Sequence, residues 1–532
     1  MNIDKLDRKE RLVIYINSFV GYEEFLMLVD DELYVDKSNI LELLNKKVCK
    51  TTRWVCVTRP RRFGKSSMTY LIESYYSKVV DTKNIFDKLK ISVSKDYLKH
   101  LNQYNIVKID FSKFYETGIT YNTYINRIIN LLDTELKKMY ANVDFDPYAE
   151  IADKFEAVND KFIFIFDEWD FIFNQNIYIE NHIQFLNFLR YLLKDRSYVA
   201  LCYMTGILPI KKHSSSSALN MFREYTFLND DVLAQYFGFT EEEVKHLCHI
   251  NNGITYEKVA EWYNGYTTKK GIRLFNPRSV IFAISDNSCQ SYWTSTGAMD
   301  EVANYLKLNA FGLREDLIRM LNGEEINIDI IEDFRAGAKL PSGKKEIYSA
   351  MITHGFLSYA HGRLRIPNKE LMIEFENSIK HDCFGELAQM IKNADEMLLA
   401  TFNKDAKKMA KIIHDIHNLE IPILKYNDEN SLSCVLTLAY LSARNRYRIE
   451  REEKSSKGYV DFIFHPRNII DLPIVIELKK DKSTKIALEQ IIEREYVTKL
   501  KKEYNRNILI VGIKYNSIDK IYTCEIIELR DF

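Results

Sequence analysis

Residues 54–68 read WVCVTRPRRFGKSSM, and this stretch decides how the N-terminal half of the chain folds. An apolar run, predicted to be a buried strand, leads into a short basic loop, and a helical stretch begins directly after Gly64. Such a strand, loop and helix form a cradle for phosphate, because backbone N–H groups and the helix N-terminus converge on an anion. Gly64 allows close backbone approach, Lys65 is expected to reach the terminal phosphates, and the Ser66 hydroxyl to meet Mg²⁺.

The loop departs from the usual phosphate-loop pattern at its start. Arg59 stands where a glycine is expected, five positions before Gly64, and Arg61 and Arg62 follow it. The missing glycine normally permits an unusual backbone turn. Taken alone, the three letters GKS therefore leave two interpretations open: a nucleotide site with an altered loop, or a basic turn.

Two further strands end in residues that suit the same site. The apolar run in KFIFIFDEWD (161–170) ends at Asp167 and Glu168. In a phosphate-loop ATPase the aspartate at this place positions Mg²⁺, and the adjacent glutamate orients the attacking water. The run YVALCYMTGI (198–207) places Thr205 at its polar end, where it is expected to sense the γ-phosphate or that water. A solvated strand end and an ordinary strand cap are the structural alternatives.

The pattern along the chain predicts an α/β protein with four parts. Between 54 and 235, short apolar strands alternate with helical stretches, which is typical of a parallel sheet covered on both faces. We expect a phosphate-loop core, a helical lid, a helical middle region and a compact mixed α/β domain, at residues 1–235, 236–285, 286–424 and 425–532 respectively.

Composition limits the partners. The 532 residues carry 74 basic and 75 acidic side chains, a net charge of −1, so any nucleic-acid site must be local. No run of 18 apolar residues occurs, and no membrane association is expected. The eight cysteines show no CxxC pair, which favours free thiols in a reducing compartment. We therefore expect a cytoplasmic protein.

A second charged cluster lies near the C-terminus. In KGYVDFIFHP (457–466) Asp461 falls early in a predicted strand, and in LPIVIELKK (472–480) Glu477 and Lys479 fall near the end of the next. Residues two apart on a strand share a face. Two carboxylates can hold Mg²⁺ against a scissile phosphate while the lysine orients or deprotonates the attacking water. An edge strand with surface charges is the alternative.

Five motifs in order give the N-terminal part a family resemblance. LYVDKSNIL (33–41), VTRPRRFGKSSM, FIFIFDEWD, YMTGI and WYNGYTTKKGIRLFNPRSV (262–280) resemble the AAA-ATPase-like family over about residues 10–285. Members also carry RPRRFGKS, so the resemblance implies an ATP site in which arginines share the stabilisation of the phosphates. It implies that Arg278 acts as a sensor or finger on the γ-phosphate, although a surface arginine is the alternative. The implied nucleotide-binding residues are Arg59, Arg61, Arg62, Phe63, Gly64, Lys65, Ser66, Ser67, Asp167, Thr205 and Arg278.

The last hundred residues resemble the PD-(D/E)XK nuclease module, over about residues 425–528. The resemblance implies catalytic roles for Asp461, Glu477 and Lys479, with Asp461 and Glu477 holding Mg²⁺, or Mn²⁺ in its place. It adds Glu429 as a further acidic ligand, for which Asp428 or Glu450 could substitute, and Gln490 as a support on the following helix. Lys480 is expected to point away.

The combined interpretation is an enzyme in which an ATP-binding module gates or powers a Mg²⁺-dependent DNA endonuclease. Basic stretches such as KKDKSTK are expected to contact the DNA backbone without reading bases. The family resemblance implies a role in bacterial defence or mobile-element control. It leaves open whether a homo-oligomer completes the ATP site. The alternatives are a nucleotide-controlled sensor or scaffold that binds DNA or a protein partner without cleavage, and an ATPase that remodels a protein partner.

Overall fold

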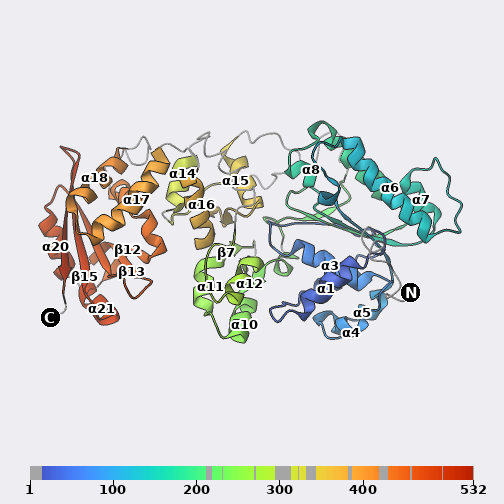
Figure 1. Ribbon diagram of the computed structural model, residues 1–532, viewed down its shortest axis with the longest axis horizontal. Helices are drawn as coiled ribbons and strands as arrows, with labels where there is room; N and C mark the ends of the chain where they lie inside the picture. Colours follow the sequence, from blue (N-terminus) through green and yellow to red (C-terminus); the bar gives the residue numbers. More distant parts are fainter. Residues whose placement is uncertain are drawn as a thin grey trace. The chain divides into compact units, whose positions relative to one another are not determined.

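A computed structural model gives the structure of the chain (Figure 1). It describes residues 15–210, 219–230, 232–268, 271–293, 313–321, 323–330, 343–381, 386–418, 429–455, 458–493 and 495–530. The described residues up to 293, together with those of 327–371, form one compact unit, and those of 313–326 and 372–530 form a second. Within these ranges no helix combines the length and the apolarity needed to cross a membrane.

The first unit is built on a parallel sheet of five strands in the order β2-β3-β4-β1-β5. The strands are β1 (Trp54–Thr58), β2 (Asn105–Asp110), β3 (Phe162–Asp167), β4 (Val199–Gly206) and β5 (Arg223–Tyr225). The core on one face is completed by α1 (Val20–Asp30), α2 (Ile40–Asn45) and α3 (Lys65–Tyr76). The core on the other face is completed by α6 (Tyr121–Met139), α7 (Ile151–Ala157) and α9 (His182–Leu193). The short helices α4 (Lys83–Phe86), α5 (Tyr97–His100) and α8 (Phe171–Asn174) lie in the connections.

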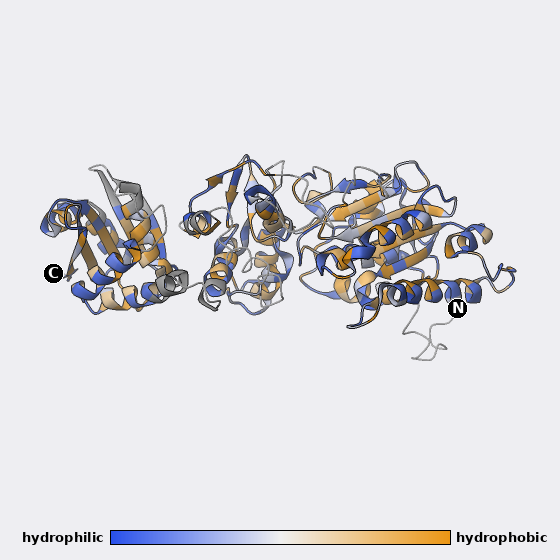
Figure 2. Cartoon of the chain, turned by 90° about the horizontal axis from the view of Figure 1, so that it is seen from above, coloured by the Kyte–Doolittle hydropathy of each residue, from blue (hydrophilic) through white to orange (hydrophobic). Residues whose placement is uncertain are grey.

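The central strands are apolar except at their carboxyl-terminal ends, because neither face of the sheet meets water. Every residue of β1, β3 and β4 is buried. Figure 2 shows hydrophobic colouring along these strands and hydrophilic colouring on the outer sides of the covering helices. The prediction of a parallel α/β sheet covered on both faces is confirmed.

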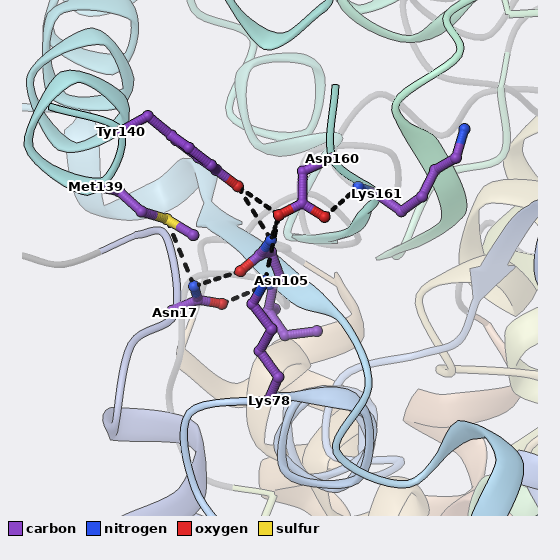
Figure 3. A network of polar contacts seen from close by, with 8 residues as sticks. Asn17, Lys78, Asn105, Met139, Tyr140, Asp160 and Lys161 are labelled. Atoms are coloured by element: carbon purple, nitrogen blue, oxygen red, sulfur yellow. Dashed lines mark hydrogen bonds and ion pairs between the residues drawn. The ribbon is translucent and has the colours of Figure 1, made fainter. Parts of the chain in front are cut away.

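A polar network closes the amino-terminal edge of this sheet (Figure 3). Asn105, at the start of β2, donates to Asp160 at 2.7 Å and accepts from Asn17 at 2.9 Å. Tyr140 also donates to Asp160, and Lys78 forms an ion pair with the same carboxylate at 3.2 Å. The polar groups of this network are paired with one another, which indicates a structural role for this end of the sheet. Ligands are expected at the opposite end, where the strands finish.

A small subdomain follows the sheet in the region predicted to be a helical lid. It contains α10 (Glu241–Asn251), α11 (Tyr256–Tyr263) and α12 (Pro277–Ser285). It also contains an antiparallel sheet of three strands that the sequence pattern did not predict: β6 (Phe239–Thr240), β8 (Arg273–Phe275) and β7 (Asn264–Thr267). A capping box formed by Thr240 and Glu243 fixes the start of α10.

The predicted helical middle region also contains short strands. Helix α15 (Lys344–Thr353) is followed by β10 (Ser358–Ala360) and β11 (Arg363–Arg365), which form a sheet with β9 (Ile326–Asn327). Strands of two or three residues show too little periodicity to be detected in a sequence. The helices α14 (Leu313–Leu321), α16 (Lys369–His381), α17 (Glu386–Phe402) and α18 (Ala406–His417) agree with the helical prediction.

The second unit is organised around a mixed sheet in the order β12-β13-β14-β15-β16. Neighbouring strands are antiparallel except β14 and β15, which are parallel. The strands are β12 (Tyr447–Ser455), β13 (Gly458–Pro466), β14 (Ile474–Lys480), β15 (Ile508–Asn516) and β16 (Ile521–Leu529). Helices α20 (Thr484–Glu493) and α21 (Glu495–Tyr504) cover one face, and α19 (Glu429–Ala439) precedes the sheet. The predicted mixed α/β fold of this region is confirmed.

Gly265→Ala is expected to destabilise the first unit by about 2 kcal/mol or more. Gly265 has φ +141°, and a Cβ there would lie 1.6 Å from the carbonyl oxygen of Pro367, where the subdomain packs on the 343–371 segment. Gly343→Ala is the control, because a Cβ there meets no atom within 4 Å. It should change stability by no more than about 0.5 kcal/mol. Urea denaturation measures both, and equal stabilities would contradict this packing.

Candidate functional site

The phosphate loop joins β1 to α3 at the carboxyl-terminal edge of the parallel sheet. Gly64 caps α3 with φ +83°, a left-handed conformation that glycine adopts without steric cost. A Cβ at this position would meet no atom within 4 Å, so the backbone angle rather than a lack of space requires glycine. The open surroundings leave the N-terminus of α3 accessible to an anion.

Arg59, which replaces the expected glycine, directs its guanidinium into the protein. The residue is 1% exposed, pairs with Asp230, and donates to the carbonyl oxygens of Thr58 and Tyr225, both at 2.8 Å. Its guanidinium also lies 4.9 Å from the ring centre of Phe237. Because protein groups hold the guanidinium, we propose that Arg59 ties the loop to the strand and turn behind it, and its implied phosphate contact stays a prediction.

Lys65 and Ser66 carry the polar groups that face the site. The Lys65 ammonium donates to the loop carbonyls of Arg59 and Pro60 at 3.2 and 3.1 Å, and the residue is 6% exposed. The Ser66 side chain lies close enough to Asp167, at the end of β3, to favour the ionised form of that carboxyl and so act to lower its pKa. The fold thus brings together the hydroxyl and the carboxylate that the sequence analysis assigned to one Mg²⁺ ion.

The carboxylates at the end of β3 are held in an unfavourable environment. Burial, followed by the charges of Glu168 and Asp110, raises the pKa of Asp167 to about 6, although Ser66 and Lys65 act in the opposite direction. Burial also raises the pKa of Glu168, against the charge of Lys65. Glu168 has φ +48°, a strained conformation for a residue with a side chain. Carboxylates of this kind gain most from a bound cation and are typical of functional sites.

Asp170 is a buried carboxylate that the sequence analysis did not select. Its side chain accepts from the backbone N–H groups of Ile207 and Leu208 at 3.0 and 2.7 Å, just beyond β4. A Cβ on Gly206 would lie 2.1 Å from this carboxylate, so the glycine is needed for the contact. Asp170 thereby fixes the end of β4, where Thr205 is completely buried. Asp170 could have been selected from the sequence, because it is the third acidic residue of the DEWD stretch at 167–170.

The other loop side chains hold the loop to the subdomain. Phe63 is completely buried and packs edge-on against Tyr266, with ring centres 5.1 Å apart. Arg62 donates to the carbonyl of Tyr292 at 3.0 Å. Arg61 is partly exposed, and its charge lowers the pKa of the neighbouring Glu168. Of the three arginines, Arg61 is therefore the best placed for a phosphate.

A mostly apolar cavity of about 140 Å³ opens beside the loop. Gly64 and Ser67 line it at the loop, and the wall opposite comes from α1, the turn after it and α12. Its apolar lining includes Phe25, Leu28, Leu33, Tyr34, Val35, Phe63, Met68, Tyr236, Phe239, Pro277 and Ile281. A flat aromatic base suits such a cavity when its phosphates lie on the adjoining loop.

The predicted γ-phosphate role of Arg278 stays a prediction. The residue is exposed at the start of α12, and its guanidinium lies 5.2 Å from the ring centre of Phe282 on the same helix. Its neighbour Pro277, in contrast, lines the cavity.

The oxygen ligands at this loop fit Mg²⁺ bound together with phosphates. Mg²⁺ prefers a few protein oxygens and completes its shell with water and substrate phosphate. In the described part of the chain, no three His, Cys, Asp or Glu residues gather closely enough to hold a metal by themselves. Ser66 and Asp167 would therefore share the ion with the nucleotide.

In the second unit, charged side chains meet where β13 and β14 stop pairing. The register between these strands ends at Phe462, and the preceding Asp461 accepts from the backbone N–H of Leu478 at 2.6 Å. Lys479 donates to Glu477 at 2.7 Å, and Glu477 is 2% exposed. Asp461, Glu477 and Lys479 thus lie together, as the sequence spacing indicated.

Helix α20 packs on the face of the sheet that carries this cluster. Glu477 and Lys479 share their face of β14 with Val475, which belongs to the core beneath α20. A Cβ on Gly512, which pairs with Glu477, would lie 2.7 Å from a carbonyl oxygen of α20. Gln490 lies on α20 and is partly buried, so its predicted support of the site remains open to test.

The additional acidic ligand is not assigned. Glu429 is the first residue of α19, but its side chain is not described, and Asp428 lies outside the described residues. Glu450, the other alternative, lies 3.3 Å from His465 and also pairs with Arg448. The role of Glu429 therefore stays a prediction.

Fold and sites together define a phosphate-loop core and a nuclease-type sheet on one chain, and comparison with known families agrees. Residues 19–216 match the family model described as a predicted AAA-ATPase. Residues 427–523 match the model of the PD-(D/E)XK nuclease superfamily. The chain thus carries an AAA-ATPase-like domain and a C-terminal PD-(D/E)XK nuclease-superfamily domain, and the resemblance seen in the sequence is confirmed.

Whole-chain comparisons add little to these domain matches. No curated protein matches the chain. Among solved structures, the Walker-type ATPase PABY2304 of Pyrococcus abyssi is similar at 12% identity and a TM-score of 0.32, with 63% of this chain and 93% of that chain covered.

Asp167→Asn is expected to stabilise the protein at pH 8 by about 1–3 kcal/mol. The pKa of Asp167 in the folded state, about 6, lies above its ordinary value of 3.8, so the ionised carboxylate lowers stability above pH 6. This cost disappears as the pH falls below the ordinary value and the group is protonated in both states. Urea denaturation at pH 8 and pH 4.5 measures the difference, which should shrink at the lower pH. A loss of stability at pH 8 would contradict the unfavourable burial.

The variants Arg59→Ala and Arg61→Ala are expected to distinguish an arginine that holds the loop in place from one that binds the phosphates of ATP. Arg59→Ala leaves Asp230 buried without its partner and should cost about 3–5 kcal/mol of stability. Arg61→Ala should change stability by less than about 0.5 kcal/mol but weaken ATP binding. Thermal denaturation and calorimetric titration with ATP measure the two effects. Equal stability losses in both variants would contradict the distinction.

Proposed function

We propose that the chain binds and hydrolyses ATP at the loop between β1 and α3, and that this ATPase gates or powers a Mg²⁺-dependent DNA endonuclease in the second unit. One observation carries the proposal: in each unit a lysine and acidic side chains, Asp167 and Glu477 among them buried, come together at the ends of strands of a sheet. In the first unit these are Lys65 with Asp167, and in the second Lys479 with Asp461 and Glu477.

At the first site, each residue has a role in phosphoryl transfer. Lys65, released from the loop carbonyls, meets the terminal phosphates, and the N-terminus of α3 receives the same charge. Ser66 and Asp167 would hold Mg²⁺, which would supply positive charge to offset the negative charge on the phosphates. Glu168 orients the attacking water, and Asp170 keeps the end of β4, with Thr205, at a fixed distance from it.

At the second site, Asp461 and Glu477 would hold the metal ion, which would supply Lewis-acid activation of the scissile phosphate. Lys479, which contacts Glu477 at 2.7 Å, orients or deprotonates the attacking water and steadies the developing charge. DNA is expected to be held through its backbone. A setting in bacterial defence or mobile-element control, and assembly as a homo-oligomer, rest on the family resemblance alone.

Incubation of the purified protein with supercoiled plasmid, Mg²⁺ and ATP tests the proposal. Cleavage is expected only with ATP and the metal ion. Glu477→Ala and Lys479→Ala should reduce cleavage by about 100-fold or more while ATP turnover persists. Lys480→Ala is the matched control, because successive strand residues point to opposite faces and Lys480 is exposed.

Lys65→Ala should abolish ATP turnover and, with it, cleavage. Undiminished cleavage by Lys65→Ala would contradict control by ATP. ATP turnover without cleavage, with Mg²⁺ or Mn²⁺, would contradict the nuclease assignment and leave a nucleotide-controlled binding protein as the better account.

A further inference from the structure

The turn between α15 and β10, residues 354–357, packs against the phosphate loop. Gly355 has φ +87°, and a Cβ at this position would lie 2.7 Å from the Cβ of Pro60. Only glycine fits so close an approach without a shift of one side. A segment far along the chain from the parallel sheet therefore forms a wall beside the loop.

Aromatic contacts hold the turn and the loop together. The hydroxyl of Tyr266 donates to the carbonyl of the turn glycine at 2.6 Å, and its ring packs against Phe63. Phe356 lies with its ring centre 6.1 Å from that of Trp293. The guanidinium of Arg62 lies over the same tryptophan, 5.3 Å from its ring centre. The turn thus approaches the loop directly at Gly355 and is linked to it through Tyr266 and Trp293.

His354 is the polar side chain of the turn, and it is buried near the cations of the loop. The residue is 7% exposed. Burial, followed by the charges of Arg61 and Lys65, lowers the pKa of His354 to about 4. Its imidazole is therefore neutral at physiological pH and retains one N–H donor. A neutral donor beside two cations is an arrangement that a bound anion stabilises.

We infer that His354 contacts the β- or γ-phosphate of the bound nucleotide, so that the 343–371 segment senses occupancy of the ATP site. Lys65 and Arg61 then approach the phosphates from the loop, and the imidazole N–H approaches them from the turn. This inference rests on the proposed ATP site and adds a contact from outside the parallel-sheet core.

Through this contact, nucleotide binding would act on a segment that leads along the chain from the first unit to the second. Helix α16 starts in the same segment, where Glu370 accepts from the hydroxyl of Ser279 and the backbone N–H of Tyr292, at 2.9 and 2.8 Å. The same helix continues past residue 371, where the second unit begins along the chain. A nucleotide that draws His354 towards the loop acts on the segment that anchors this helix.

Calorimetric titration of the full chain with ATP, ADP and AMP tests the inference, using His354→Ala, His354→Gln and Lys65→Ala. His354→Ala should weaken ATP binding by at least about tenfold, as expected for loss of one charge-assisted hydrogen bond, and leave AMP binding unchanged. His354→Gln keeps an N–H donor and should lose less. His361→Asn is the control, because His361 is exposed in the next turn and asparagine tolerates its φ of +51°.

The outcomes separate this inference from the ATP site itself. If the wild-type protein does not bind ATP, or Lys65→Ala binds it equally well, the proposed ATP site is wrong. If Lys65→Ala loses binding but His354→Ala binds ATP as tightly as the wild type, only the histidine contact is overturned.

Hydrogen–deuterium exchange of the wild-type protein provides a test that needs no variant to fold. Peptides that cover residues 354–357 should exchange more slowly with ATP than with AMP. Equal exchange in the two nucleotides would overturn the contact.

Discussion

Buried charge at the carboxyl-terminal edge of the parallel sheet is the constraint on which the first unit depends. Lys65, Asp167 and Asp170 are each no more than 6% exposed, and a folded protein gains little from such burial unless the charges serve a site. Lys65 rests on loop carbonyls, which a phosphate can replace, and Asp167 is buried near the charges of Glu168 and Asp110, whose repulsion a bound cation would offset. The rest of the fold supplies rigid supports for these few groups: apolar strands on one side and a loop tied down by Arg59 and Phe63 on the other.

The second unit also brings a lysine and acidic side chains together, but on strands of a mixed sheet. Here the pairing of two antiparallel strands ends at Phe462, and Asp461 and Glu477 lie at that point rather than at a helix N-terminus. Asp461 caps the backbone N–H of Leu478, and Glu477 is held by Lys479, so the carboxylates are placed before any ligand arrives. Each site thus combines a lysine with acidic oxygens, a pairing suited to phosphate esters with divalent cations.

The sequence predicted what local patterns determine. Apolar runs located the strands, the GKS triplet located the loop, and the alternation of side chains along a strand placed Glu477 and Lys479 on one face. Contacts between distant segments were not predictable. Nothing near Arg59 indicates that Asp230 will neutralise it, and a glycine after His354 gives no sign that this turn packs on Pro60.

A crystal structure of the protein with a non-hydrolysable ATP analogue and Mn²⁺ tests the central claim most directly, since anomalous scattering locates the metal ion. The account predicts one ion between Ser66, Asp167 and the terminal phosphates, with the adenine in the apolar cavity beside Gly64. An ion distant from Asp167, or a nucleotide bound away from the loop, would contradict it.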